Sequence, residues 1–274
     1  MGVELELAPG VLVPRQETEL LGERALEILR GLAGEPVMID MCCGSGNLAL
    51  AIASAAPTLR VWGADLTDET VALARRNTKR LGLEDRVAIH QGDLFGALAG
   101  QGLESRVDIV VCNPPYISTA RLEGESAHLL ESEPREAFEG GPYGISILQR
   151  LVREAPDFLK PGGWLVLTTP NGFRIRNVLR MLANREVLDI YRYPEEGQPL
   201  GHQHEYTVRQ MDWQLRHARF APQVCRTYVT GWRGASPAAR FAHLATVPFN
   251  LAPHLRDGLM AAAKAPESVS NATN

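Results

Sequence analysis

The most informative stretch of this sequence reads VMIDMCCGSGN and spans residues 37–47. Its apolar first half, Val37–Met41, predicts a buried strand, and the apolar residues 48–56 behind the glycines predict a helix. A strand, a glycine loop and a helix in this order bring backbone close to a nucleotide-like ligand. Gly-Ser-Gly alone is a weak signal, because an ordinary strand-to-helix turn has the same composition.

Three more predicted strands follow, and each leads into a polar residue. The strands span residues 60–64, 86–90 and 107–112, and the polar residues behind them are Asp65, Asp93 and Asn113. Helices are expected between the strands, most clearly over residues 68–81, where Thr67 can act as the N-cap. Parallel strands that alternate with helices end at one edge of their sheet, so these polar tips indicate a shared crevice.

The fourth strand runs into Asn113-Pro114-Pro115-Tyr116. Neither proline can donate a backbone hydrogen bond, and the proline after Asn113 holds that residue extended. Oδ1 of Asn113 and the carbonyl oxygen of Pro114 would then form an edge of acceptors beside the ring of Tyr116. Such an edge suits a planar group with two N–H donors, such as an amide, a guanidine or an aromatic amine. A simple proline turn is the plainer alternative for this run on its own.

The segments outside this region predict a small N-terminal unit and a longer C-terminal one. Residues 3–13 alternate around a Pro-Gly turn and predict a hairpin, and Thr18 can cap a helix that ends near residue 29. The C-terminal predictions are a helix over 145–159, a fifth strand over 164–169, a helix opened by a Thr207/Gln210 capping box, a strand over 224–229 and a helix over 240–265. We therefore divide the chain into a hairpin and helix (1–35), a catalytic domain (36–235), a helical extension (236–265) and a frayed tail (266–274).

Composition narrows the classes of protein further. The chain has 274 residues, 45% of them hydrophobic, which is enough for one large domain. A net charge of −4 indicates no broad nucleic-acid-binding surface. We expect no membrane helix and no signal peptide, because no apolar run approaches about 18 residues and the N-terminus has no basic and apolar segments. The four cysteines show no metal-ligand spacing, so we expect reduced thiols, no metal and a cytoplasmic location.

Together the motifs resemble those of a class I S-adenosylmethionine (SAM) methyltransferase. The residues that carry this resemblance are Asp40-x-x-x-Gly44-Ser45-Gly46, Asp65, Gly92-Asp93-Leu94-Phe95 and Asn113-Pro114-Pro115-Tyr116. Two further motifs, Pro14-Arg15-x-Glu17-Thr18-Glu19 and Glu133-Pro134-Arg135-x-Ala137-x-x-Gly140-Gly141, are similar to those of the HemK (PrmC) family of protein-glutamine N5-methyltransferases. The resemblance covers about residues 9–170. It implies an α/β, Rossmann-like fold with a mostly parallel seven-stranded sheet and helices on both faces.

The resemblance also implies roles for individual residues. The positions that would bind SAM are Asp40, Cys42, Gly44 and Gly46 at its methionine part, Asp65 and Leu66 at the ribose, Asp93 and Leu94 at the adenine, and Asn113 near the methyl group. In catalysis, Asn113 and Pro114 would hold the acceptor nitrogen while Tyr116 packs on its plane. Substrate contacts are expected from Arg15, Thr18, Pro115, His202 and His204, although the two histidines also fit an ordinary surface loop.

Several differences from the family bear on the substrate. Cys42 stands where the family has glycine, Gln16 stands where it has proline, and Thr168-Thr169-Pro170 stands where a strand usually ends in an acid. The sequence begins at the hairpin, without the family's N-terminal helical recognition domain. The motifs favour a SAM-dependent N-methyltransferase that acts on a planar nitrogen, and these differences favour a small molecule or an amino-acid side chain as its carrier. The alternatives are methylation of a protein glutamine, methylation of a nucleobase amino group, and a non-catalytic SAM-fold module that binds a partner. The oligomeric state stays open.

Overall fold

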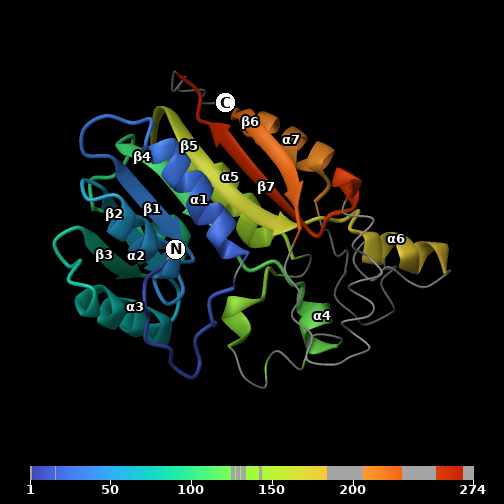
Figure 1. Ribbon diagram of the computed structural model, residues 1–274, viewed down its shortest axis with the longest axis horizontal. Helices are drawn as coiled ribbons and strands as arrows, with labels where there is room; N and C mark the ends of the chain where they lie inside the picture. Colours follow the sequence, from blue (N-terminus) through green and yellow to red (C-terminus); the bar gives the residue numbers. More distant parts are fainter. Residues whose placement is uncertain are drawn as a thin grey trace.

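The chain folds around a seven-stranded sheet with the strand order β3-β2-β1-β4-β5-β7-β6 (Figure 1). The computed structural model describes residues 2–15, 17–124, 127, 130, 134–141, 144–183, 206–229 and 251–267. The strands are β1 (Val37–Met41), β2 (Arg60–Asp65), β3 (Val87–Gln91), β4 (Val107–Cys112), β5 (Leu159–Pro170), β6 (Ala221–Tyr228) and β7 (Gly258–Lys264). Strands β1 to β5 pair in parallel and only β7 runs against its two neighbours. The predicted α/β class with a mostly parallel seven-stranded sheet is confirmed.

Helices cover both faces of the sheet. The α-helices are α1 (Thr18–Leu29), α2 (Asn47–Ala55), α3 (Asp68–Arg80), α4 (Thr119–Glu123), α5 (Ser146–Phe158), α6 (Ile175–Leu182) and α7 (Val208–His217). Short 3-10 helices are η1 (Leu94–Leu98), η3 (Arg135–Ala137) and η5 (Pro253–Leu255). Helices α1, α2 and α3 share one apolar core with the sheet, and η1, α5 and α7 share the other. None of the helices in the described part of the chain is long and apolar enough to cross a membrane.

The central strands are apolar throughout because both of their faces are covered. In β1, Met38 belongs to one core while Ile39 and Met41 belong to the other, as the two-residue period of a strand requires. Helices α3 and α7 begin at the predicted capping residues. The Thr67 side chain accepts a bond from the backbone N–H of Thr70 at 3.3 Å, and Thr207 with Gln210 forms the predicted capping box.

The predicted N-terminal hairpin is wrong. Residues 2–8 form no strand, because the amide of Asn77 on α3 takes the place of a partner strand. The backbone N–H of Glu6 donates to Oδ1 of Asn77 at 2.7 Å, and Nδ2 of Asn77 donates to the carbonyl oxygen of Glu6 at 3.2 Å. Thr18 is likewise the first residue of α1 and not its cap, which is Glu17.

The predicted C-terminal helix is also wrong where the structure describes it. Residues 258–264 form β7, which lies between β5 and β6, and Ala261, Ala262 and Ala263 are fully buried there. Alanine favours a helix in isolation, and a short apolar run has no periodicity that separates a buried strand from a buried helix. Pairing on both sides of β7 overrides that local preference. Residues 236–250 of the predicted extension lie outside the described residues.

Candidate active site

A cavity of about 310 Å³ lies at the carboxyl ends of β1, β2, β3 and β4. This volume is in the range of small-molecule sites. The sheet order changes direction between β1 and β4, and open α/β sheets bind their ligands at such a point. Of the residues predicted to bind cofactor, those that line the cavity are Cys42, Gly44, Asp65, Leu66, Asp93, Leu94 and Asn113. The structure therefore brings together the predicted tips of all four strands.

The loop after β1 forms one wall with backbone in the left-handed region. The φ angles are +58° at Cys42, +58° at Gly44 and +81° at Gly46. Gly46 is the N-cap of α2, and a Cβ there would lie 3.1 Å from a methyl carbon of Leu50. Cys42 keeps the conformation expected of the glycine that it replaces, at a cost of about 1–2 kcal/mol for a residue with a Cβ. The glycine-loop shape thus persists in spite of the substitution.

Asp65 is fixed at the end of β2 by two backbone donors. Its Oδ2 accepts from the N–H of Gly44 and its Oδ1 from the N–H of Leu66, both at 2.8 Å. Burial raises the pKa of Asp65, and the two N–H bonds act in the opposite direction. Each oxygen retains a lone pair for a further donor, so a pair of ribose hydroxyls matches this carboxylate.

Asp40 lies beneath the glycine loop and does not line the cavity. It is 1% exposed, and its Oδ2 accepts from the backbone N–H of Ala49 on α2 at 2.9 Å. Burial raises the pKa of Asp40 to about 7, the bond from Ala49 lowers it, and the nearby charge of Asp65 raises it further. Its Oδ1 has no hydrogen-bond partner among the described residues. A buried carboxylate oxygen without a partner is costly when charged, which agrees with the raised pKa.

The charges around the cavity distinguish between ligand classes. Four carboxylates line it, from Asp65, Asp93, Glu136 and Glu139, and no lysine, arginine or histidine stands among the described lining residues. A ligand with a pyrophosphate would meet these four carboxylates and no lining cation here. A ligand with a sulfonium or ammonium cation fits, so the residues present match SAM.

Asn113 lies at the edge of the cavity with its amide oxygen already held. Oγ1 of the buried Thr168, on β5, donates to Oδ1 of Asn113 at 3.0 Å. One lone pair of Oδ1 is thereby used and the other stays available. Pro115 lines the cavity and Tyr116 is 42% exposed, whereas Pro114 is buried. Asn113 is thus held in one orientation, as a binding edge for a planar group requires.

Tyr228, at the end of β6, bonds with Thr168 and is a neighbour of the site that the sequence does not predict. Burial raises its pKa well above the usual range, with a smaller contribution in the same direction from Tyr116, while a hydrogen bond with Thr168 lowers it. The ring lies over Gly258, where a Cβ would collide with it. The sequence marks Thr168 only as a replacement for an acid. Nothing local marks Tyr228, because its place depends on how β6 pairs with β7.

The run 113–116 is braced by the motif around residues 134–141. The N–H of Ile117 donates to the carbonyl oxygen of Phe138, and the N–H of Gly140 donates to that of Ile117, both at 2.7 Å. A Cβ on Gly144 would lie 2.5 Å from the carbonyl oxygen of Tyr116, so glycine is needed for this close approach.

Side chains reinforce the same contact. Oγ1 of Thr119 donates to Glu139 at 2.6 Å, and Arg135 lies 3.4 Å from Glu139 and 3.3 Å from Glu123. The two motifs therefore act as one structural unit at the mouth of the cavity.

One pair of predicted substrate residues lies away from this site. Arg15 and Thr18 line a separate cavity of about 340 Å³ together with residues of α2. His202 and His204 lie outside the described residues. The substrate role of these four residues stays a prediction. Among the described residues, no group of three or more His, Cys, Asp and Glu side chains is placed to hold a metal ion.

Comparison with known proteins agrees with this geometry. A family model described as a methyltransferase domain matches residues 34–211. The release factor glutamine methyltransferase of Geobacter sulfurreducens is 37% identical over 190 residues, which are 69% of this chain and 63% of that protein. The enzyme of the same name from Bordetella pertussis is 39% identical over 193 residues, 68% of this chain and 67% of that protein.

Solved structures share the fold at low identity. Geranyl diphosphate C-methyltransferase from Streptomyces coelicolor A3(2) superposes with a TM-score of 0.54 at 15% identity, over 90% of this chain and 80% of that one. A putative methyltransferase in complex with the Haloferax volcanii Trm112 activator gives 0.55 at 14% identity, over 92% of each chain.

The chain therefore belongs to the methyltransferase family, and the predicted class, a Rossmann-like SAM-dependent methyltransferase, is confirmed. Within that class, the two curated relatives are release factor glutamine methyltransferases. This chain spans 63% of the length of the Geobacter relative.

Proposed function

We propose that this protein transfers the methyl group of SAM to the side-chain amide nitrogen of a protein glutamine, in a substrate of the release-factor type. One observation carries the proposal. The amide oxygen of Asn113 is held by Thr168 at the edge of an acidic cavity, in a position to accept an N–H bond from a planar nitrogen. The named activity of the curated relatives supports a protein glutamine as the carrier of that nitrogen.

In this proposal SAM supplies a methyl group activated by a cationic sulfur. The glycine loop would hold its methionine part, Asp65 would accept bonds from its ribose hydroxyls, and Asp93 would face its adenine. The carboxylates around the cavity lower the energy of the cationic donor and contribute no competing cation.

The protein's task at the acceptor is positioning. An amide nitrogen is a weak nucleophile, because its lone pair is delocalised into the carbonyl. Two N–H bonds, accepted by Asn113 and the Pro114 carbonyl, would concentrate electron density on the nitrogen and align it with the methyl group. The nitrogen gains a methyl group and loses one proton to solvent, so no side chain is required as a general base.

The choice of an amide over a guanidinium rests on the named activity of the curated relatives, because the acidic residues that line the cavity would accept either group. The cytoplasmic location expected from the sequence stays part of this proposal.

Methyl transfer from tritiated SAM tests the function. We expect label on a purified release factor, at the glutamine of its Gly-Gly-Gln loop when peptides are analysed by mass spectrometry, and none with the Asn113→Ala variant. Free glutamine, arginine and hydroxyl-bearing compounds serve as competing acceptors. Label on a small amide with none on the release factor would replace the protein substrate by a small molecule. Label on hydroxyl acceptors alone would refute N-methylation.

A further inference from the structure

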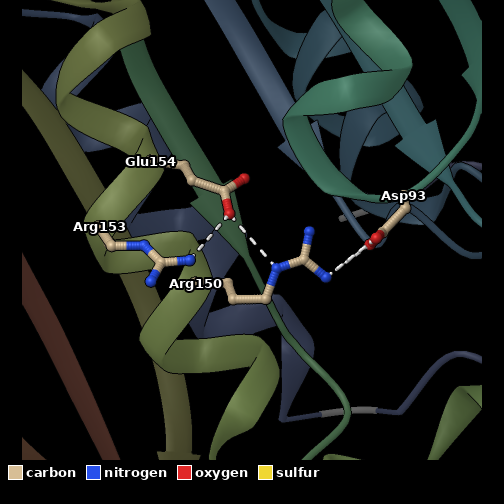
Figure 2. Close-up of polar contacts among 4 residues, drawn as sticks. All are labelled: Asp93, Arg150, Arg153 and Glu154. Carbon is tan, nitrogen blue, oxygen red and sulfur yellow. Dashed lines mark hydrogen bonds and ion pairs between the residues drawn. The ribbon is translucent and has the colours of Figure 1, made fainter.

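Asp93, the residue predicted to face adenine, is held by an arginine from α5 (Figure 2). Nη1 of Arg150 lies 2.9 Å from Oδ1 and 3.0 Å from Oδ2 of Asp93. On its other side, Nε of Arg150 lies 3.3 Å from Oε1 of Glu154, and Nη2 of Arg153 approaches the same oxygen at 3.7 Å. Figure 2 shows Arg150, Arg153 and Glu154 on one helix, with Asp93 opposite them. One guanidinium thus joins Asp93 to α5.

This contact joins two walls of the cofactor cavity. Asp93 and its neighbours form the wall after β3, whereas Ile147 of α5, one turn before Arg150, forms part of the facing wall. The turn before Asp93 requires glycine, because Gly92 has a φ of +151° and a Cβ there would lie 2.9 Å from Cα of Ala97. The Asp93 side chain is 60% exposed, so Arg150 is what restrains its carboxylate. A pair this exposed adds little to folding stability, and its main effect is on orientation.

We propose that Arg150 is a positioning residue that holds the carboxylate of Asp93 toward the adenine amino group and so sets the preference for adenine. The inference rests on the proposed function, since it requires a bound adenosyl group. A carboxylate only accepts hydrogen bonds, so it favours the N–H donors of adenine and repels a purine with oxygen at position 6. Because Nη1 straddles both oxygens, the remaining lone pairs keep a constant direction. Without Arg150, the exposed carboxylate of Asp93 rotates, and the preference for adenine over a 6-oxopurine weakens.

Calorimetric binding of two ligands tests this role. The ligands are S-adenosylhomocysteine and S-inosylhomocysteine, in which an oxo group at position 6 replaces the amino group and N1 carries a hydrogen. We expect Arg150→Gln to lower the affinity for S-adenosylhomocysteine about three- to tenfold, as for loss of a charge-assisted contact. The affinity for S-inosylhomocysteine should change by less than about twofold. In steady-state turnover, Arg150→Gln should raise the KM for SAM more than it lowers kcat. Arg150→Lys, which keeps one charged nitrogen for Asp93, should retain most of the preference.

Arg153→Gln is the matched control, because Arg153 lies on the same helix and shares the carboxylate of Glu154, but stands on the far side of Glu154 from Asp93 (Figure 2). It should leave both affinities unchanged. The inference would be overturned if Arg150→Gln lowered both affinities equally or left both unchanged. It would also be overturned if Arg153→Gln had the same effect as Arg150→Gln. So would an intact preference in Asp93→Asn. Wild-type protein that binds neither ligand would refute the proposed function itself, whereas binding and methylation with an unaltered preference in Arg150→Gln would refute only the role of Arg150.

Discussion

At the scale of single residues, the hydroxyl of Thr168 donates to the amide oxygen of Asn113, and we propose that turnover depends on this contact. Thr168→Val keeps the volume of the side chain but removes the donor, so kcat should fall about five- to tenfold. Asn113→Ala removes the acceptor itself and should cost about 100-fold in kcat. Both variants should bind SAM with nearly wild-type affinity in calorimetry. Thr168→Ser, which restores the hydroxyl, is the control, and full activity of Thr168→Val would contradict the arrangement.

Asp40 makes stability depend on pH at the same scale. Burial raises its pKa from 3.8 to about 7, so between these values the folded state keeps a proton that the unfolded chain has lost. The free energy of unfolding of the ligand-free protein should therefore decrease as pH rises from about 4 to 7, by an amount on the order of 4 kcal/mol from this group.

Asp40→Asn has no proton to lose and should abolish that contribution. Urea unfolding of both proteins at several pH values between these limits measures the difference. Parallel stability curves for wild type and variant would show that Asp40 does not titrate in this way.

At the scale of elements, the packing of β7 against Tyr228 of β6 requires glycine at position 258. A Cβ on Gly258 would collide with the Tyr228 ring. Gly258→Ala should therefore destabilise the fold by about 1–3 kcal/mol, the usual cost of overpacking, and should also lower turnover by displacing Tyr228. Thermal unfolding and the transfer assay measure the two effects.

Gly96→Ala is the matched control for this substitution. A Cβ added at Gly96 would meet no heavy atom of the described residues within 4 Å. The variant should therefore change stability by less than about 0.5 kcal/mol. Equal behaviour of the two variants would count against this role of Gly258.

At the scale of the whole molecule, the strand order gathers the site. Five parallel strands bring Asp65, Asp93 and Asn113 to one edge of the sheet, and the β6–β7 pair places Tyr228 against Thr168, the partner of Asn113. Since β7 belongs to the sheet, we propose that the catalytic domain extends to residue 264 and that no separate helical extension follows residue 235 within the described chain.

The acidic cavity also predicts which ligands stabilise the entire fold. SAM at about 100 times its Kd should stabilise the protein by about 2.7 kcal/mol and raise Tm by roughly 5–10 °C. NAD, whose pyrophosphate would face the carboxylates, should give no shift. Asp65→Ala should weaken SAM binding about ten- to hundredfold, because it removes the two-oxygen acceptor for the ribose. Stabilisation by NAD in a thermal-shift assay would contradict the charge argument.

Much of this arrangement was predictable from local sequence. The parallel strands, the left-handed glycine loop, the caps at Thr67 and Thr207 and the polar tips at Asp65 and Asn113 all follow from short-range periodicity, glycine and proline chemistry and capping bonds. These effects act within a few residues, and they were enough to indicate the class of fold and its ligand edge.

Contacts between residues far apart in the sequence determined the remaining parts of the fold and the site. Residues 258–264 became a strand because two neighbours bury it, and Asn77 satisfied the backbone that had looked like a hairpin. Thr168 meets Asn113 across 55 positions and Arg150 meets Asp93 across 57. Such contacts leave no local pattern, because each side chain is ordinary in its own segment and acquires its role only from the partner that the sheet places beside it. The place of Asn113 at the cavity was therefore predictable from the sequence, whereas Thr168, which holds its amide oxygen, appeared only when the strands were assembled.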